Sequence, residues 1–152
     1  MRLSQPRFDL KSRGASLCAI TCLVVSVALG ASGSKSVWSG VYTDQQAAAG
    51  EKIYYDRCAL CHGDDLGGVE KAPALVGIAF LDSWHGKTLR KLFERIESMP
   101  PDEPKVVSGE EVANVLAFLL HSSAIPSGST RLPTDRSLLA EITIERAKPA
   151  KE

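Results

Sequence analysis

The sequence lacks an excess of charge of either sign, and it contains little sulfur. Its 152 residues include 18 basic and 18 acidic side chains, so the formal net charge is zero. No basic field therefore points to a nucleic-acid partner. There are four cysteines and two methionines, whereas the composition is otherwise ordinary at 44% hydrophobic and 24% charged residues. The length suits a single domain.

The sequence also has no apolar run long enough to be a standard transmembrane helix. Its N-terminal apolar run extends from Ala15 to Leu29, short of the roughly 20 residues that span a bilayer. Basic residues precede this run, and small residues from Gly30 to Ser34 follow it. This order predicts a secretory signal peptide over residues 1–33 and an exported, periplasmic protein. The alternative is an uncleaved segment that anchors the chain to the membrane.

Removal of the signal peptide changes which sulfur atoms remain. Cys18, Cys22 and Met1 would leave with it, so the mature chain would keep Cys58, Cys61 and Met99 as its only sulfur-containing residues. An exported chain meets an oxidising compartment, where two cysteines this close together need a specific explanation.

The two cysteines stand in the sequence CALCH, residues 58–62, and three kinds of site compete for them. A thioredoxin-like redox pair needs a strand that runs into a helix, but no strand precedes the motif and a glycine-rich stretch follows it. A zinc site needs two further ligands at suitable spacing, and His85 and His121 lie far apart in the sequence. The third kind is the attachment site of haem c, whose signature is C-x-x-C-H.

The order of the residues in this motif suits haem attachment. Residues i and i+3 lie on one face of a helical turn, so Cys58 and Cys61 can reach the two vinyl groups on one porphyrin edge. The next residue, His62, can then bind the iron. We therefore predict one covalently bound haem c, with His62 as an axial iron ligand.

Iron bound to His62 has a sixth coordination position, and Met99 is our candidate for it. Met99 lies in the sequence ESMPP after a predicted helix, and the following Pro100 stiffens the backbone. The alternatives are a core role for Met99, ligation by His85 or His121, and an open position. His85 is expected on a surface loop and His121 at a solvated helix end.

Three helical segments frame the motif, and residues 38–121 contain no convincing strand. We predict a first helix over residues 45–57 with Asp44 as its N-cap, and a middle helix over 88–98. Ser108 and Glu111 predict a capping box for a last helix whose buried face contains Val112, Val115, Leu116 and Leu119. The fold class is therefore all-α. The tail beyond residue 121 begins as a linker, and SLLAEITIER within it is either a short helix or an extended segment.

The motifs together resemble the class I c-type cytochromes. The resemblance is carried by CALCHGDDLGG, APALVG, the segment that ends in ESMPPDEP, and EEVANVLAFLL. Within this family the chain is most similar to the small monohaem cytochromes and domains that accompany bacterial quinoprotein and alcohol dehydrogenases. The resemblance implies a cytochrome c domain over residues 34–121, wrapped around its haem, and assigns no counterpart to residues 122–152.

The resemblance also implies roles for individual residues. Cys58 and Cys61 would carry the thioether bonds, and His62 and Met99 would be the axial ligands. The carbonyl of Pro73 would accept a hydrogen bond from the ring of His62. Trp84 would lie near a haem propionate, with plain core packing as the alternative. Gly50 and Phe118 would mark the crossing of the first and last helices.

The function expected from these features is single-electron transfer rather than substrate chemistry. Redox proteins would be the partners, with a quinoprotein dehydrogenase and a terminal oxidase as candidates. The alternative is a haem enzyme or sensor, with an open or displaceable sixth ligand, that binds a small molecule or reduces peroxide. Whether the chain is a free carrier or an enzyme subunit stays open at this point.

Overall fold

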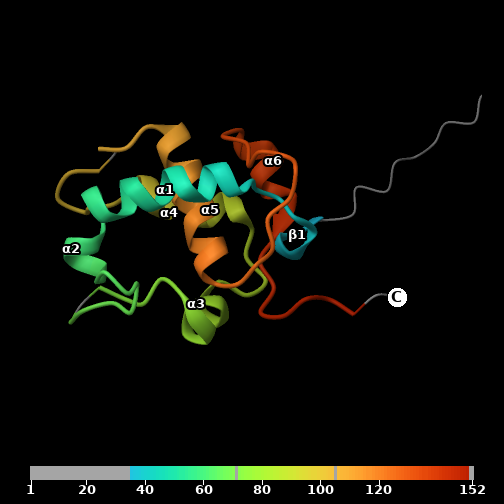
Figure 1. The fold of residues 1–152 in the computed structure, drawn as a ribbon, viewed down its shortest axis with the longest axis horizontal. Coiled ribbons are helices and arrows are strands. Elements are labelled where there is room, and N and C mark those ends of the chain that lie inside the picture. The colour runs from blue at the N-terminus through green and yellow to red at the C-terminus, as the bar shows by residue number, and fades with distance from the viewer. Residues whose placement is uncertain (1–34, 71, 105, 151–152) are drawn as a thin grey trace, which may run out of the picture. The chain divides into compact units, whose positions relative to one another are not determined.

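The computed structural model describes residues 35–70, 72–104 and 106–150, all within one compact unit. The predicted signal peptide, residues 1–33, lies outside the described residues. Helices dominate the fold (Figure 1), which confirms the predicted fold class. In chain order the elements are β1 (Lys35–Ser36), the 3-10 helix η1 (Val37–Ser39), α1 (Asp44–Arg57), α2 (Ala59–His62), α3 (Gly77–Trp84), α4 (Leu89–Glu97), α5 (Gly109–Ser122), α6 (Arg136–Ala140) and β2 (Ile142–Thr143).

Helices α1 and α5 pack against each other, and each begins with a capping box. The prediction for α5 is confirmed, because Ser108 Oγ accepts the N–H of Glu111 at 3.3 Å while the Glu111 carboxylate accepts the N–H of Ser108 at 2.7 Å. The predicted cap of α1 was wrong by one residue. Asp44 lies in the first turn, and Thr43 caps the helix because its hydroxyl accepts the N–H of Gln46 and the Gln46 side chain accepts that of Thr43.

The close approach of α1 and α5 depends on Gly50. A Cβ atom at this position would lie 1.8 Å from the backbone oxygen of Asn114, so any side chain would push the two helices apart. Further along the same interface, the ring of Phe118 lies 5.4 Å from that of Tyr54. The predicted buried face of α5 is confirmed, since four residues are at most 3% exposed: Val112, Val115, Leu116 and Leu119.

The middle of the chain contains one helix that was predicted and one that was not. Helix α4 agrees with the predicted middle helix, and Thr88 and Ser98 flank it as its caps. Helix α3 was missed because it is short and begins at Gly77, after Val76, which supplies no capping side chain. The aromatic ring of Phe80 and the side chain of Leu81 bury one face of α3.

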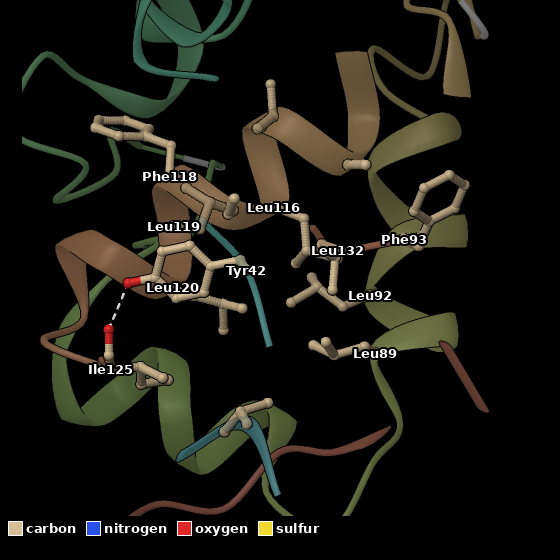
Figure 2. Close-up of a cluster of buried hydrophobic side chains, with 14 of the residues drawn as sticks. Tyr42, Leu89, Leu92, Phe93, Leu116, Phe118, Leu119, Leu120, Ile125 and Leu132 are labelled. Atoms are coloured by element: carbon tan, nitrogen blue, oxygen red, sulfur yellow. Dashed lines mark hydrogen bonds between the residues drawn. The ribbon is translucent and has the colours of Figure 1, made fainter. Parts of the chain in front are cut away.

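The segment after α5 packs onto the helical core. It contains α6 and then β2, which pairs in parallel with β1, so both structures considered for this segment are present. Its buried side chains are Ile125, Leu132, Leu139, Ile142 and Ile144. In Figure 2, Leu132 lies among the side chains of α4 and α5, and the hydroxyl of Tyr42 donates a hydrogen bond to the carbonyl oxygen of Ile125 at 2.5 Å.

None of the helices within the described residues combines the length and the apolar character needed to cross a bilayer.

Replacement of Gly50 by alanine tests the helix crossing. Alanine favours an isolated helix by about 1 kcal/mol over glycine, but here its Cβ would overlap the Asn114 carbonyl. We expect a net loss of about 2 kcal/mol or more in the free energy of unfolding, measured by urea titration. Gly109→Ala is the matched control, since its Cβ would meet only the Phe93 ring at 3.8 Å. Equal effects of the two substitutions would contradict a close contact at Gly50.

Two buried tyrosines predict a loss of stability at high pH. Burial raises the pKa of Tyr42 and of Tyr54 to about 12 from the ordinary value of 10. The unfolded chain therefore loses these protons first, so their contribution is complete below pH 10 and disappears as the pH rises toward 12. The free energy of unfolding, measured by circular dichroism, should fall over this window. The fall should be smaller in Tyr42→Phe, and an identical pH profile in that variant would refute the assignment.

Candidate haem site

One cavity of about 520 Å³ collects the residues that the sequence singled out. Its size lies within the range of cofactor and ligand sites. Cys58, Cys61 and His62 line it, together with Pro73, Trp84 and Met99. Apolar side chains supply much of the remaining wall: Ala72, Leu75, Phe80, Leu92, Ile96, Val106, Val107, Val115 and Leu119. Groups that are far apart in the sequence therefore share one largely apolar enclosure.

The CALCH sequence forms a helical turn directly after α1. The N–H of Cys61 and that of His62 both donate to the carbonyl of Cys58, at 3.1 and 3.0 Å. Both cysteines are free thiols; Cys58 is half-buried and Cys61 is exposed. Burial raises the pKa of the Cys58 thiol, although the nearby positive charge of Arg57 opposes this. The turn thus presents two separate thiols and an imidazole to the same cavity.

His62 is oriented by a hydrogen bond to the loop that follows it. The carbonyl oxygen of Pro73 accepts a hydrogen bond from its Nδ1 at 3.0 Å, so Nε2 of the neutral ring is the nitrogen that is able to bind a metal. Gly68 allows the chain to return to His62, because its φ is 79° and a Cβ there would lie 2.5 Å from the backbone oxygen of Ala72. The structure therefore brings together His62 and Pro73, as the family resemblance implied.

The other predicted residues reach the cavity from α3 and from the end of α4. Trp84 is the last residue of α3, and Met99 follows α4, with its N–H donating to the carbonyl of Ile96 at 3.0 Å. The two rival ligands are elsewhere. His85 and His121 are exposed and do not line the cavity, and His121 lies edge-on to the ring of Tyr42 at 6.5 Å.

Among the described residues, three basic side chains line the cavity, and sequence reasoning missed all of them. They are Arg57, Lys87 and Arg95, and no Asp or Glu is among the described residues of the lining. The ammonium of Lys87 lies 4.9 Å from the centre of the Trp84 ring and donates to the carbonyl of Ser83 at 2.6 Å. Arg57 directly precedes the CALCH sequence, which was the one available signal. Together the three cations favour a ligand that carries negative groups.

This set of groups fits a haem. Two thiols on one turn can form covalent bonds to the ring edge, and the unprotonated Nε2 of His62 can bind iron. The apolar wall suits a porphyrin, while the cations suit its carboxylates. The thioether of Met99 is a second iron donor on the same cavity wall.

Comparisons with known proteins agree with this site. The family model described as "Cytochrome C oxidase, cbb3-type, subunit III" matches residues 45–119. The cbb3-type cytochrome c oxidase subunit CcoP of Rubrivivax gelatinosus is 36% identical over 87 residues. That alignment covers 54% of this chain and 28% of the relative, so the chain corresponds to only part of that longer protein.

Among solved structures, the sulfane dehydrogenase SoxCD from Paracoccus pantotrophus is similar over 70% of this chain and 61% of the SoxCD chain. The TM-score is 0.45 and the sequence identity is 20%, too distant to indicate a shared activity.

The matched segment contains the CALCH turn, Pro73, Trp84 and Met99, and the helices that enclose the cavity lie within it or extend one turn beyond it. Residues 45–119 therefore form a cytochrome c domain that is similar to the class I c-type cytochromes, a family whose cofactor is haem c.

Proposed function

We propose that this protein is a periplasmic single-electron carrier with one covalently attached haem c. Cys58 and Cys61 would form the two thioether bonds, and His62 and Met99 would be the axial ligands. The observation that carries this proposal is that both thiols, the imidazole and the Met99 thioether line the same cavity. Trp84 and Pro73, on that wall as well, would bind the cofactor and orient His62.

The haem supplies the one-electron chemistry of iron, and the protein fixes the conditions for it. The hydrogen bond from His62 Nδ1 to Pro73 fixes the tautomer and the ring orientation and makes Nε2 a stronger donor. A thioether ligand in an apolar cavity favours the reduced metal and raises the reduction potential. His62 and Met99 both lie on the cavity wall and would hold the iron in either oxidation state, so little of the protein would have to move when an electron is transferred.

Electrons would enter and leave on the side of the CALCH turn. Cys61 is exposed there, and the side chain of Leu60 is 95% exposed. A small exposed patch with an apolar residue suits brief encounters with redox partners. An oxidase or a dehydrogenase would be such a partner, and a quinoprotein dehydrogenase fits the family resemblance. The N-terminal sequence supports export to the periplasm, or attachment to the membrane if it is not cleaved.

The two thiols provide the first test of this proposal. When Cys58 and Cys61 are both replaced by serine, the exported protein should lose all haem that survives denaturation, measured by haem staining of a denaturing gel and by intact mass. The unchanged protein should carry one haem. Cys18→Ser with Cys22→Ser is the matched control and should not affect attachment. Covalent haem in the Cys58→Ser/Cys61→Ser variant would refute the proposed attachment.

The thioether provides the second test. The ferric protein should be low-spin and should show the weak long-wavelength absorption band of an iron–thioether bond, and Met99→Ala should remove this band. His85→Gln and His121→Gln are controls that should leave the spectrum unchanged, because neither residue lines the cavity. If the wild-type protein is high-spin and binds carbon monoxide rapidly when reduced, the result would instead indicate an enzyme or sensor with an open sixth position.

A further inference from the structure

The C-terminal residues 132–146, here called the strap, lie beyond the segment that matches the family model, which ends at residue 119. The strap contains α6 and β2 and contributes four side chains to the core that are at most 5% exposed: Leu132, Leu139, Ile142 and Ile144. A segment outside the matched range that buries this much apolar surface needs an explanation of its own.

The strap begins at a firm attachment to α1. The side-chain amide of Gln46 donates to the carbonyl of Leu132 at 3.0 Å, and its oxygen accepts the N–H of Leu132 at 2.7 Å. Gln46 is 1% exposed, so these two hydrogen bonds, together with the one that its oxygen accepts from Thr43, satisfy a buried polar group. The first residue of the strap is therefore held in one position relative to the helical core.

The strap next contacts the C-terminal end of α4. The guanidinium of Arg136 donates to both carboxylate oxygens of Glu97, at 2.9 and 2.7 Å, and lies 5.7 Å from the centre of the Phe93 ring. The side chain of Arg136 is 50% exposed but that of Glu97 is only 19% exposed, so the carboxylate of this pair is partly shielded from solvent. Met99 is two residues further along, and its N–H is bonded to the last turn of α4.

The strap then contacts the N-terminal end of α4. The N–H of Gly86 donates to the carbonyl of Ile144, and the N–H of Ile144 donates to the carbonyl of Lys87, both at 2.9 Å. Arg146 forms an ion pair with Asp82 on α3. These contacts hold the turn between Trp84 and Lys87, two residues that line the cavity.

Helix α4 is therefore held at both ends by one segment. It is nine residues long, and a helix of this length is unstable without tertiary contacts. Helix ends are also the parts of a helix that open most easily. Two walls of the cavity need a fixed position, and both are attached to these ends. Trp84 and Lys87 precede α4, and Met99 follows it.

We propose that the strap positions α4, and that the Arg136–Glu97 ion pair in particular holds Met99 against the iron. This inference rests on the proposed axial ligation by Met99. Arg136 and Glu97 do not touch the cofactor; they are positioning residues that act through the last turn of α4. Loosening that turn lets Met99 leave the iron more often, so an added ligand can take its place.

The test compares Arg136→Gln with Arg131→Gln in the complete, haem-loaded protein. Arg131 pairs with Glu110 at the start of α5, and both partners are 57% exposed, so this variant loses an ion pair of the same type without touching α4. Imidazole is titrated into the ferric protein and followed by absorption. Arg136→Gln should increase the apparent affinity for imidazole about two- to fivefold, whereas Arg131→Gln should leave it unchanged. Arg136→Lys should restore part of the difference.

Hydrogen exchange gives an independent readout. The amide of Met99 should exchange faster in Arg136→Gln than in the unchanged protein, while amides in α1 and α5 should keep their rates. Glu97→Gln should have the same effect, and the double variant should show no further change because both residues act through one interaction. If Arg136→Gln does not fold, Glu97→Gln alone is used for both measurements.

Each outcome decides the proposal. Equal imidazole affinity in Arg136→Gln and Arg131→Gln would overturn it, and so would uniformly faster exchange throughout α1, α4 and α5, since that indicates only a general loss of stability. If the wild-type protein lacks the iron–thioether band, ligation by Met99 is refuted instead. Faster exchange at the Met99 amide alone would then still show that the strap positions α4.

Discussion

The protein depends on one hydrogen bond, from the ring of His62 to the carbonyl of Pro73. This bond fixes the tautomer and the orientation of the imidazole on the CALCH turn, and so directs Nε2 as a metal ligand. The bond forms because the loop after the turn folds back on itself, which requires glycine at position 68. The crossing of α1 and α5 at Gly50 in turn fixes where the turn begins. Two glycines that do not line the cavity thus help to determine where the imidazole lies.

The cavity divides its tasks among different parts of the chain. The turn after α1 supplies thiols and imidazole, α3 and the end of α4 supply Trp84 and Met99, and three basic residues give it a positive lining. None of the described residues after α5 lines the cavity. They instead hold the helix that carries one wall, which explains why a segment outside the matched family region is packed so firmly against the core.

Sequence reasoning was successful where a few neighbouring residues determine the result. The CALCH turn, the capping box of α5 and the apolar face of α5 all follow from local spacing, and each is present in the structure. The cap of α1 was misplaced by one residue because Thr43 and Asp44 are both good capping residues, and only the position of Gln46 decides between them. Helix α3 was missed because its start has no capping side chain.

Features that depend on distant contacts could not be predicted. The exposure of Lys87 to the cavity depends on the turn that Ile144 holds, and the position of Arg136 beside Glu97 depends on how the chain returns after α5. Neither pairing leaves a pattern in the sequence, because the partners are separated by dozens of residues with no fixed spacing. The residues that carry the chemistry of the site could therefore be predicted from the sequence, whereas the contacts that hold them in place could not.

Proton NMR of the reduced, exported protein tests the central claim most directly. A methyl group bound through sulfur to the iron lies over the porphyrin ring, whose ring current shifts its resonance far upfield. With axial ligation by Met99 we predict one such three-proton resonance, absent from Met99→Ala and unchanged in His85→Gln. A spectrum of the haem-loaded protein without this resonance, or one that keeps it after Met99 is replaced, would contradict the coordination derived from the cavity.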